Sequence, residues 1–88
     1  MTRDEIRRAV LAALAHVAPD ADLAALDPRA DLREALDLDS MDFLNFVLAL
    51  HEALHVEIAE REYRAFSTVE DAIDALLAKL GAKTADHA

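Results

Sequence analysis

Apolar residues have helical periodicity over the first part of the chain. They recur every three or four positions from Ile6 to Val17, a spacing that places side chains on one face of a helix. Thr2 and Glu5 stand just before this stretch at the spacing of a capping box, in which each side chain bonds the other residue's backbone amide. The pattern predicts a helix from about Arg3 to Val17.

A long connection follows, punctuated by Asp27 and Pro28 and reaching Asp39. Loops of this length inside small domains are usually functional or packed down by their own side chains. We therefore expect an ordered loop that can include one helical turn. Five leucines are available to hold it against the core: Leu23, Leu26, Leu32, Leu36 and Leu38.

The second helix should run from Ser40 to about His55, and its apolar residues divide between two faces at ~100° per residue. The core face would carry Phe43, Phe46, Val47, Leu50 and Leu54. The second face carries Met41, Leu44 and Leu48, with Asn45 and Glu52 beside them. A small domain cannot fully cover both faces, so the second predicts a docking surface for another protein. The plainer alternative is that it is further core.

Two more helical segments complete the pattern. A brief helix is compatible with Ala59–Arg64. Ser67 and Glu70 then repeat the capping-box spacing before a final amphipathic helix that Gly81 should close.

The composition supports a single all-α domain. Of 88 residues, 55% are hydrophobic, one is glycine and two are proline, which favours helices over strands. We assign residues 1–81 to a four-helix bundle, with three main helices, a short third helix and a long first loop. Residues 82–88 are expected to form a flexible tail.

The chain is strongly acidic, with a formal net charge of −9 at pH 7. This charge argues against nucleic acid or an anionic membrane as a partner and favours basic protein surfaces. There is no cysteine, so any thiol chemistry must be imported. No signal-peptide pattern or membrane-spanning apolar run is visible, and we expect a monomeric cytoplasmic protein.

The segment Asp39-Ser40-Met41-Asp42 places a hydroxyl where the long loop turns into the second helix. A helix start presents unpaired backbone N–H groups and the positive end of the macrodipole, so a phosphate ester on Ser40 would be stabilised there. The alternative is an ordinary capping serine, which contributes about 1 kcal/mol to helix stability.

These features together resemble the acyl carrier protein family of phosphopantetheine-bearing domains, over about Arg3 to Leu80. The resemblance rests on Asp39-Ser40-Met41 opening an acidic helix, followed by Val56-Glu57-Ile58 and Ser67-Thr68-Val69-Glu70. The family's motif is usually Asp-Ser-Leu, so Met41 is a mild departure, because methionine is also apolar and adaptable at protein contacts.

The resemblance implies that Ser40, with Asp39 beside it, is esterified to 4′-phosphopantetheine by a separate phosphopantetheinyl transferase that uses coenzyme A. It implies a non-catalytic carrier, loaded with an acyl or aminoacyl thioester by a ligase or transferase and used by downstream enzymes. The implied partner surface comprises Asp37, Met41, Asp42, Leu44, Asn45, Leu48 and Glu52.

The same resemblance implies a cargo pocket between the second and third helices. Its expected lining is Phe46, Leu50, Ile58, Tyr63 and Phe66. Family members commonly have a small side chain where Tyr63 stands, so its ring should shrink the pocket. We therefore expect a short or polar cargo, such as a small acyl or aminoacyl group, rather than a long fatty chain.

Two other functions stay open on the sequence alone. One is an unmodified acidic adaptor that binds partners through Met41, Leu44 and Leu48. The other is a zinc hydrolase, because His51–His55 matches H-E-x-x-H, in which two histidines one helical turn apart bind zinc and the glutamate is the general base. So short a chain offers no substrate cleft, so we interpret the two histidines as surface residues and expect no metal site.

Overall fold

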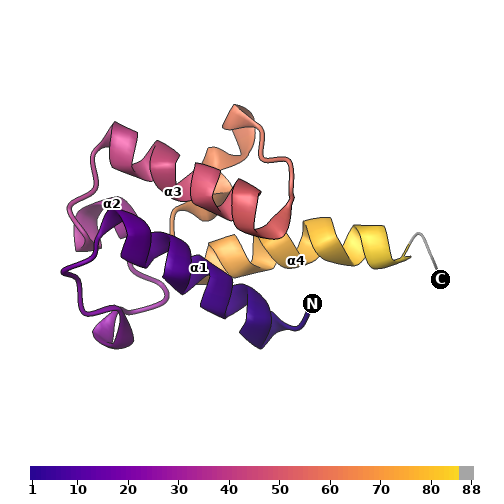
Figure 1. Cartoon of the computed structure of the whole chain (residues 1–88), viewed down its shortest axis with the longest axis horizontal. Coiled ribbons are helices and arrows are strands. Elements are labelled where there is room, and N and C mark those ends of the chain that lie inside the picture. The colour runs from indigo at the N-terminus through magenta and orange to yellow at the C-terminus, as the bar shows by residue number, and fades with distance from the viewer. Residues whose placement is uncertain (86–88) are drawn as a thin grey trace.

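The computed structural model describes residues 1–85, with side chains through Leu80, and every regular element in that part is helical (Figure 1). The elements are α1 (Arg3–Val17), η1 (Leu23–Ala25), α2 (Leu32–Ala35), α3 (Ser40–Leu54), η2 (Glu60–Phe66) and α4 (Val69–Ala85). The all-α class is confirmed, with three long helices and a short 3₁₀ helix, η2, between α3 and α4. None of the described helices is long and apolar enough to cross a membrane.

α1 begins and ends where the hydrophobic pattern predicts. The capping box is formed: the Glu5 amide donates to Thr2 Oγ1 at 3.2 Å, and the Thr2 amide donates to Glu5 Oε1 at 2.8 Å. Hydrogen bonding to Thr2 lowers the pKa of the Glu5 carboxyl. The apolar stripe of α1 is fully buried at Ile6, Val10 and Leu14, and the helix packs on both α3 and α4.

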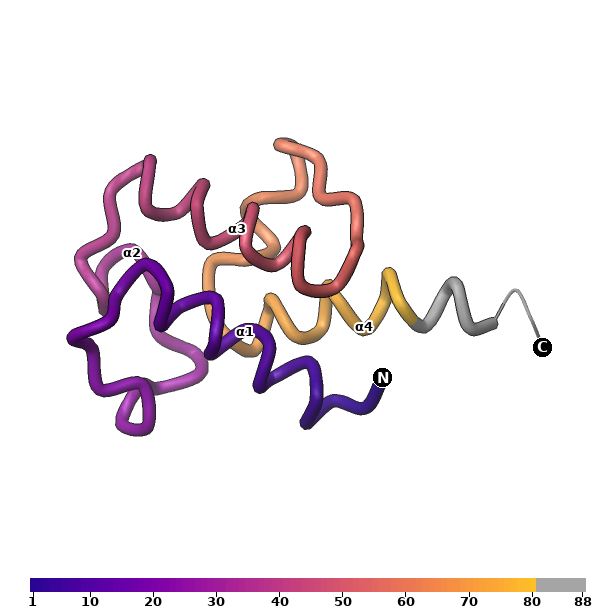
Figure 2. The backbone as a smooth tube through the Cα atoms, viewed as in Figure 1, coloured from indigo at the N-terminus to yellow at the C-terminus, as the bar shows by residue number. Residues whose placement is uncertain are grey.

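The core lies between the three long helices, whose crossing is visible along the backbone in Figure 2. From α3 it takes Phe46, Val47 and Leu50, which are at most 1% exposed. Phe43 and Leu54 are half-buried and pack against the same core. The predicted core face of the second helix is therefore confirmed.

The long connection is ordered, as its leucines predict. Leu32 and Leu38 are buried, and Leu23, Leu26 and Leu36 pack half-buried against the core. Two backbone hydrogen bonds fasten the connection to the start of α4. The Leu32 amide donates to the Ser67 carbonyl at 2.8 Å, and the Glu70 amide donates to the Pro28 carbonyl at 2.9 Å. The position of the loop is thus fixed relative to the start of α4.

η2 is held against α4 by the side chain of Glu62. This carboxylate pairs with Lys79 on α4 and accepts the backbone N–H of Ala59 at 2.9 Å. The hydrogen bond from Lys79, followed by the one from the Ala59 amide, lowers the pKa of Glu62. The brief helix expected near residues 59–64 is confirmed, as a 3₁₀ helix that extends to Phe66.

The cap of α4 is Thr68, so the prediction of a capping box from Ser67 is wrong. Thr68 Oγ1 accepts the Asp71 amide at 3.0 Å, whereas the Ser67 hydroxyl donates to the Arg64 carbonyl at 2.7 Å. The sequence contains two overlapping pairs at capping spacing, Ser67 with Glu70 and Thr68 with Asp71. Spacing cannot choose between them, and the end of η2 uses the serine.

The predicted end of the last helix is also wrong, because α4 continues through Gly81 to Ala85. A glycine inside a helix costs only about 1 kcal/mol relative to alanine, and the alanines that follow favour the helix. The tail expected over residues 82–88 therefore starts as helix, and residues 86–88 lie outside the described residues.

The cap assignment predicts the stabilities of three variants. Thr68→Ala should lower the free energy of unfolding by about 1 kcal/mol, because the Asp71 amide loses its acceptor. Thr68→Ser keeps the hydroxyl and should recover most of that loss. Urea denaturation followed by circular dichroism measures both, and a larger loss in Ser67→Ala than in Thr68→Ala would contradict the assignment.

Candidate functional site

Ser40 is the first residue of α3, and its side chain is exposed. The N-terminus of α3 is capped by Asp39 and Asp42 instead. The Asp42 amide donates to Asp39 Oδ1 at 2.8 Å, and the Asp39 amide donates to Asp42 Oδ2 at 3.3 Å. The alternative of an ordinary capping serine is therefore wrong. Its hydroxyl lies at a helix start without serving the helix.

A turn between α2 and α3 sets the position of Ser40. The Leu38 amide donates to the Arg33 carbonyl at 2.9 Å, a bond that closes the end of α2. Such a turn needs a left-handed residue, and Asp37 takes that conformation with φ of 54°. Leu38 is only 6% exposed, while Asp37 and Asp39 on either side of it are exposed. A buried leucine thus anchors the chain two residues before the serine.

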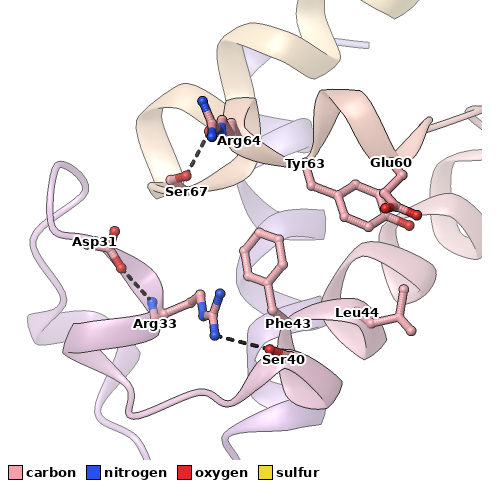
Figure 3. A pocket seen from close by; sticks show the side chains of 9 residues that line it. All are labelled: Asp31, Arg33, Ser40, Phe43, Leu44, Glu60, Tyr63, Arg64 and Ser67. Atoms are coloured by element: carbon pink, nitrogen blue, oxygen red, sulfur yellow. Dashed lines mark hydrogen bonds between the residues drawn. The ribbon is translucent and has the colours of Figure 1, made fainter.

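Ser40 lies on the wall of a pocket of about 410 Å³ between α2, α3 and η2 (Figure 3). The pocket is lined by Asp31, Arg33, Ser40, Phe43, Leu44, Glu60, Tyr63, Arg64 and Ser67. The Phe43 and Tyr63 rings meet edge to face, with centroids 6.3 Å apart. The site therefore combines one exposed hydroxyl with an aromatic wall and two guanidinium groups.

Arg33 contacts the serine directly. Its Nη2 donates to Ser40 Oγ at 3.3 Å, and this bond is drawn in Figure 3. The sequence pattern did not predict Arg33, Phe43 or Arg64 as pocket residues. No local pattern could have found them, because the pocket forms only when η2 folds onto the start of α3 and the turn after α2 brings Arg33 to Ser40.

The residues expected to line a cargo pocket separate into two groups. Tyr63 lines the pocket beside Ser40. Phe46, Leu50 and Phe66 have no exposed surface and belong to the core, and Ile58 is half-buried against it. The structure therefore does not bring these five side chains around one opening, and their role in cargo binding stays a prediction.

The second face of α3 is open to solvent. Met41 is 63% exposed and Leu48 is 45% exposed, so the alternative that this face is further core is wrong for both. Leu44 is half-buried, because it also lines the pocket. Asn45 and Glu52 are exposed beside them. The acidic positions lie at the start of the same helix, with Asp37 exposed and Asp42 half-buried in the cap.

The zinc motif does not have the helical geometry that it requires. α3 ends at Leu54, and His55 follows in the left-handed conformation with φ of 53° and ψ of 44°. The two histidines are therefore not one turn apart on a continuous helix. His51 is half-buried, with Nδ1 2.6 Å from the Val56 carbonyl oxygen. Among the described residues, no group of three or more His, Cys, Asp or Glu side chains could hold a metal ion.

Comparison with known proteins gives a consistent result. The family model described as "Phosphopantetheine attachment site" matches residues 6–76. An acyl carrier protein of Rubrobacter xylanophilus is 38% identical over 53 residues, which cover 60% of this chain and 65% of that protein. Acyl carrier proteins of Thermosynechococcus vestitus and Syntrophobacter fumaroxidans are each 36% identical over 55 residues, covering 62% of this chain and 68% of each relative. The aligned region thus spans about two thirds of these relatives.

The turn before Ser40 can be tested at Asp37. Asp37→Gly and Asp37→Ala remove the same charge, but only glycine adopts a positive φ without steric cost. We expect the alanine variant to unfold about 1 kcal/mol more easily than the glycine variant, as measured by urea denaturation. Equal stability of the two variants would show that Asp37 is not held in the left-handed conformation.

Proposed function

This chain belongs to the phosphopantetheine attachment family, and from that membership we propose that Ser40 is the residue that carries the 4′-phosphopantetheine arm. The protein is a phosphopantetheine-bearing carrier and not itself a catalyst. The observation that carries the assignment is the exposed Ser40 hydroxyl at a helix start. Asp39 and Asp42 cap the helix, so this hydroxyl is not used as the cap.

The choice between the chain's two serines supports Ser40. Ser67 also lines the pocket, but it is half-buried and its hydroxyl is bonded to the Arg64 carbonyl. Modification there would break this bond at the junction of η2 and α4. Ser40 is exposed, and an ester on its Oγ would extend from the surface beside the pocket, where the Arg33 guanidinium already lies. The residues around Ser40 therefore fit a phosphate ester.

The arm ends in a thiol, the group that this cysteine-free chain lacks, and that thiol can hold an acyl group as a thioester. The protein's own part is to present Ser40 at an exposed and rigid position. We propose three classes of partner: a phosphopantetheinyl transferase, a ligase or acyltransferase that loads the thiol, and enzymes that use the thioester. In keeping with the family, we place these exchanges in the cytoplasm.

We propose that these partners dock on the open face of α3. Met41 and Leu48 supply exposed apolar contacts, and Met41 follows Ser40 directly, so a protein that covers it also reaches the serine. The net charge of −9 attracts a basic partner surface over about a Debye length, ~8 Å at physiological salt. Such contacts should be fast, weak and sensitive to salt.

We further propose a short or polar cargo. Phe46, Leu50 and Phe66 fill the core with no exposed surface, and Phe43 packs between Phe46 and Tyr63 with ring centroids 5.9 and 6.3 Å away. A long acyl chain could enter the bundle only by displacing these rings. Burying a ring typically contributes a few kcal/mol, so the entry of a long chain is opposed. A small group can stay in the open pocket.

The attachment site is tested by intact mass. Incubation with coenzyme A, magnesium and a broad-specificity transferase should add about 340 Da to the parent protein. Ser67→Ala is the matched control, because it removes the other serine from the same pocket, and it should gain the same mass. Ser40→Ala should gain nothing. An unmodified parent protein would favour the acidic adaptor, and a modified Ser40→Ala variant would place the arm elsewhere.

The docking face is tested by transferase kinetics. Replacing both Met41 and Leu48 with serine removes two exposed apolar contacts, each worth about 1 kcal/mol at an interface, so kcat/KM should fall by roughly 10- to 30-fold. The variant should fold normally, since neither side chain is in the core. Ala53→Ser changes an exposed position of α3 away from this face and should have no effect. Unchanged kcat/KM in the double variant would exclude this face.

A further inference from the structure

Two arginines line the pocket beside Ser40 in a protein that is acidic as a whole. Elsewhere in the described part of the chain, several cations are neutralised by a carboxylate, namely Arg3, Arg8, Arg29 and Lys79. Arg33 and Arg64 line the pocket and have no ion-pair partner among the described residues. The pocket's own carboxylates are Asp31 and Glu60. Neither guanidinium group forms an ion pair with these carboxylates, so both remain able to pair with an anion in the pocket.

The backbone of Arg33 is fixed from both sides. Asp31 caps α2 and accepts the Arg33 amide at 3.0 Å, and the Arg33 carbonyl accepts the Leu38 amide at 2.9 Å. The side chain then reaches across the turn to Ser40, where Nη2 donates to Oγ at 3.3 Å (Figure 3). The same residue thus closes the turn that positions Ser40 and places a cation on its oxygen.

The start of α3 needs this cation if an anion is to sit there. The favourable field of a helix N-terminus is offset here by the carboxylates of Asp39 and Asp42. The Asp39 carboxylate also accepts the first-turn amide of Asp42, and the Asp42 carboxylate accepts the amide of Asp39. A phosphodiester on Ser40 would add a third negative charge within the same turn. Arg33 is the cation that the structure places in hydrogen-bond contact with the serine.

We propose that Arg33 is a positioning residue that binds the phosphate of the arm and holds its attachment point on the pocket side of α3. The proposal rests on the attachment at Ser40 proposed above. A guanidinium group presents a planar set of N–H donors that matches two phosphate oxygens at once, which the hydroxyl of unmodified serine cannot offer. The Nη2–Oγ contact places the guanidinium group at the oxygen that would form the ester. Arg64 faces the same pocket without contacting Ser40, so its effect is secondary.

The test is the ³¹P NMR spectrum of the modified protein, after intact mass has shown that each variant carries the arm. In the parent protein the phosphodiester signal should differ between the folded and the urea-unfolded state. Arg33→Ala should lose most of that difference, and Arg33→Lys should recover part of it, because lysine keeps the charge but not the planar donor pair. Raising the salt concentration should reduce the difference in the parent, since an exposed ion pair is screened.

Two arginine variants serve as controls. Arg7→Ala removes an exposed arginine of α1 that does not line the pocket, and the parent signal should be retained. Arg64→Ala should have a smaller effect than Arg33→Ala. A signal unchanged by Arg33→Ala, or an equal loss in Arg64→Ala, overturns the role of Arg33 while leaving the arm on Ser40 intact. Failure of the parent to gain mass overturns the attachment proposal instead, so the two failures are distinguishable.

Discussion

The burial of Leu38 is the constraint on which the site depends. This side chain is drawn into the core between two exposed aspartates, and the left-handed Asp37 lets the chain turn sharply enough to put it there. Once Leu38 is buried, Asp39 emerges at the right place to cap α3, and Ser40 follows on the outside. The apolar core therefore determines the exposure of a polar group that makes no contribution to it.

α3 carries out two tasks with separate sets of side chains. Phe46, Val47 and Leu50 hold it in the bundle and are at most 1% exposed, so fold stability does not draw on the opposite face. Met41 and Leu48 can stay open to solvent because the core is complete without them. Their exposure carries a free-energy cost in water, which a transient partner would relieve. The helix thus fixes the distance between the serine and the apolar contacts without needing the partner for its own stability.

Much of the fold could be predicted from the sequence, because local patterns of capping and apolar residues mark the helices. Thr2 and Glu5 mark the start of α1, and the spacing of apolar residues separates the two faces of α3. Local patterns gave the wrong prediction where two capping pairs overlapped, at Ser67 and Thr68. They also failed at Gly81, where one glycine did not end a helix whose neighbouring residues favour helix. The histidine motif failed for a related reason, since H-E-x-x-H presumes a helix that here ends one residue too early.

Only part of the site could be predicted from the sequence, and the part that could not is formed by tertiary structure. Ser40 could be found because it lies inside a linear motif at a helix start. Arg33 could not, because its side chain reaches the serine only across the turn at Asp37. The same turn explains why a helix N-terminus alone was an incomplete account of the electrostatics: the sequence shows the carboxylates of the cap, but only the fold shows the cation set against them. In the proposed pairing, Arg33 places a single positive charge at the attachment point, and the net charge of −9 over the whole molecule still attracts basic partners.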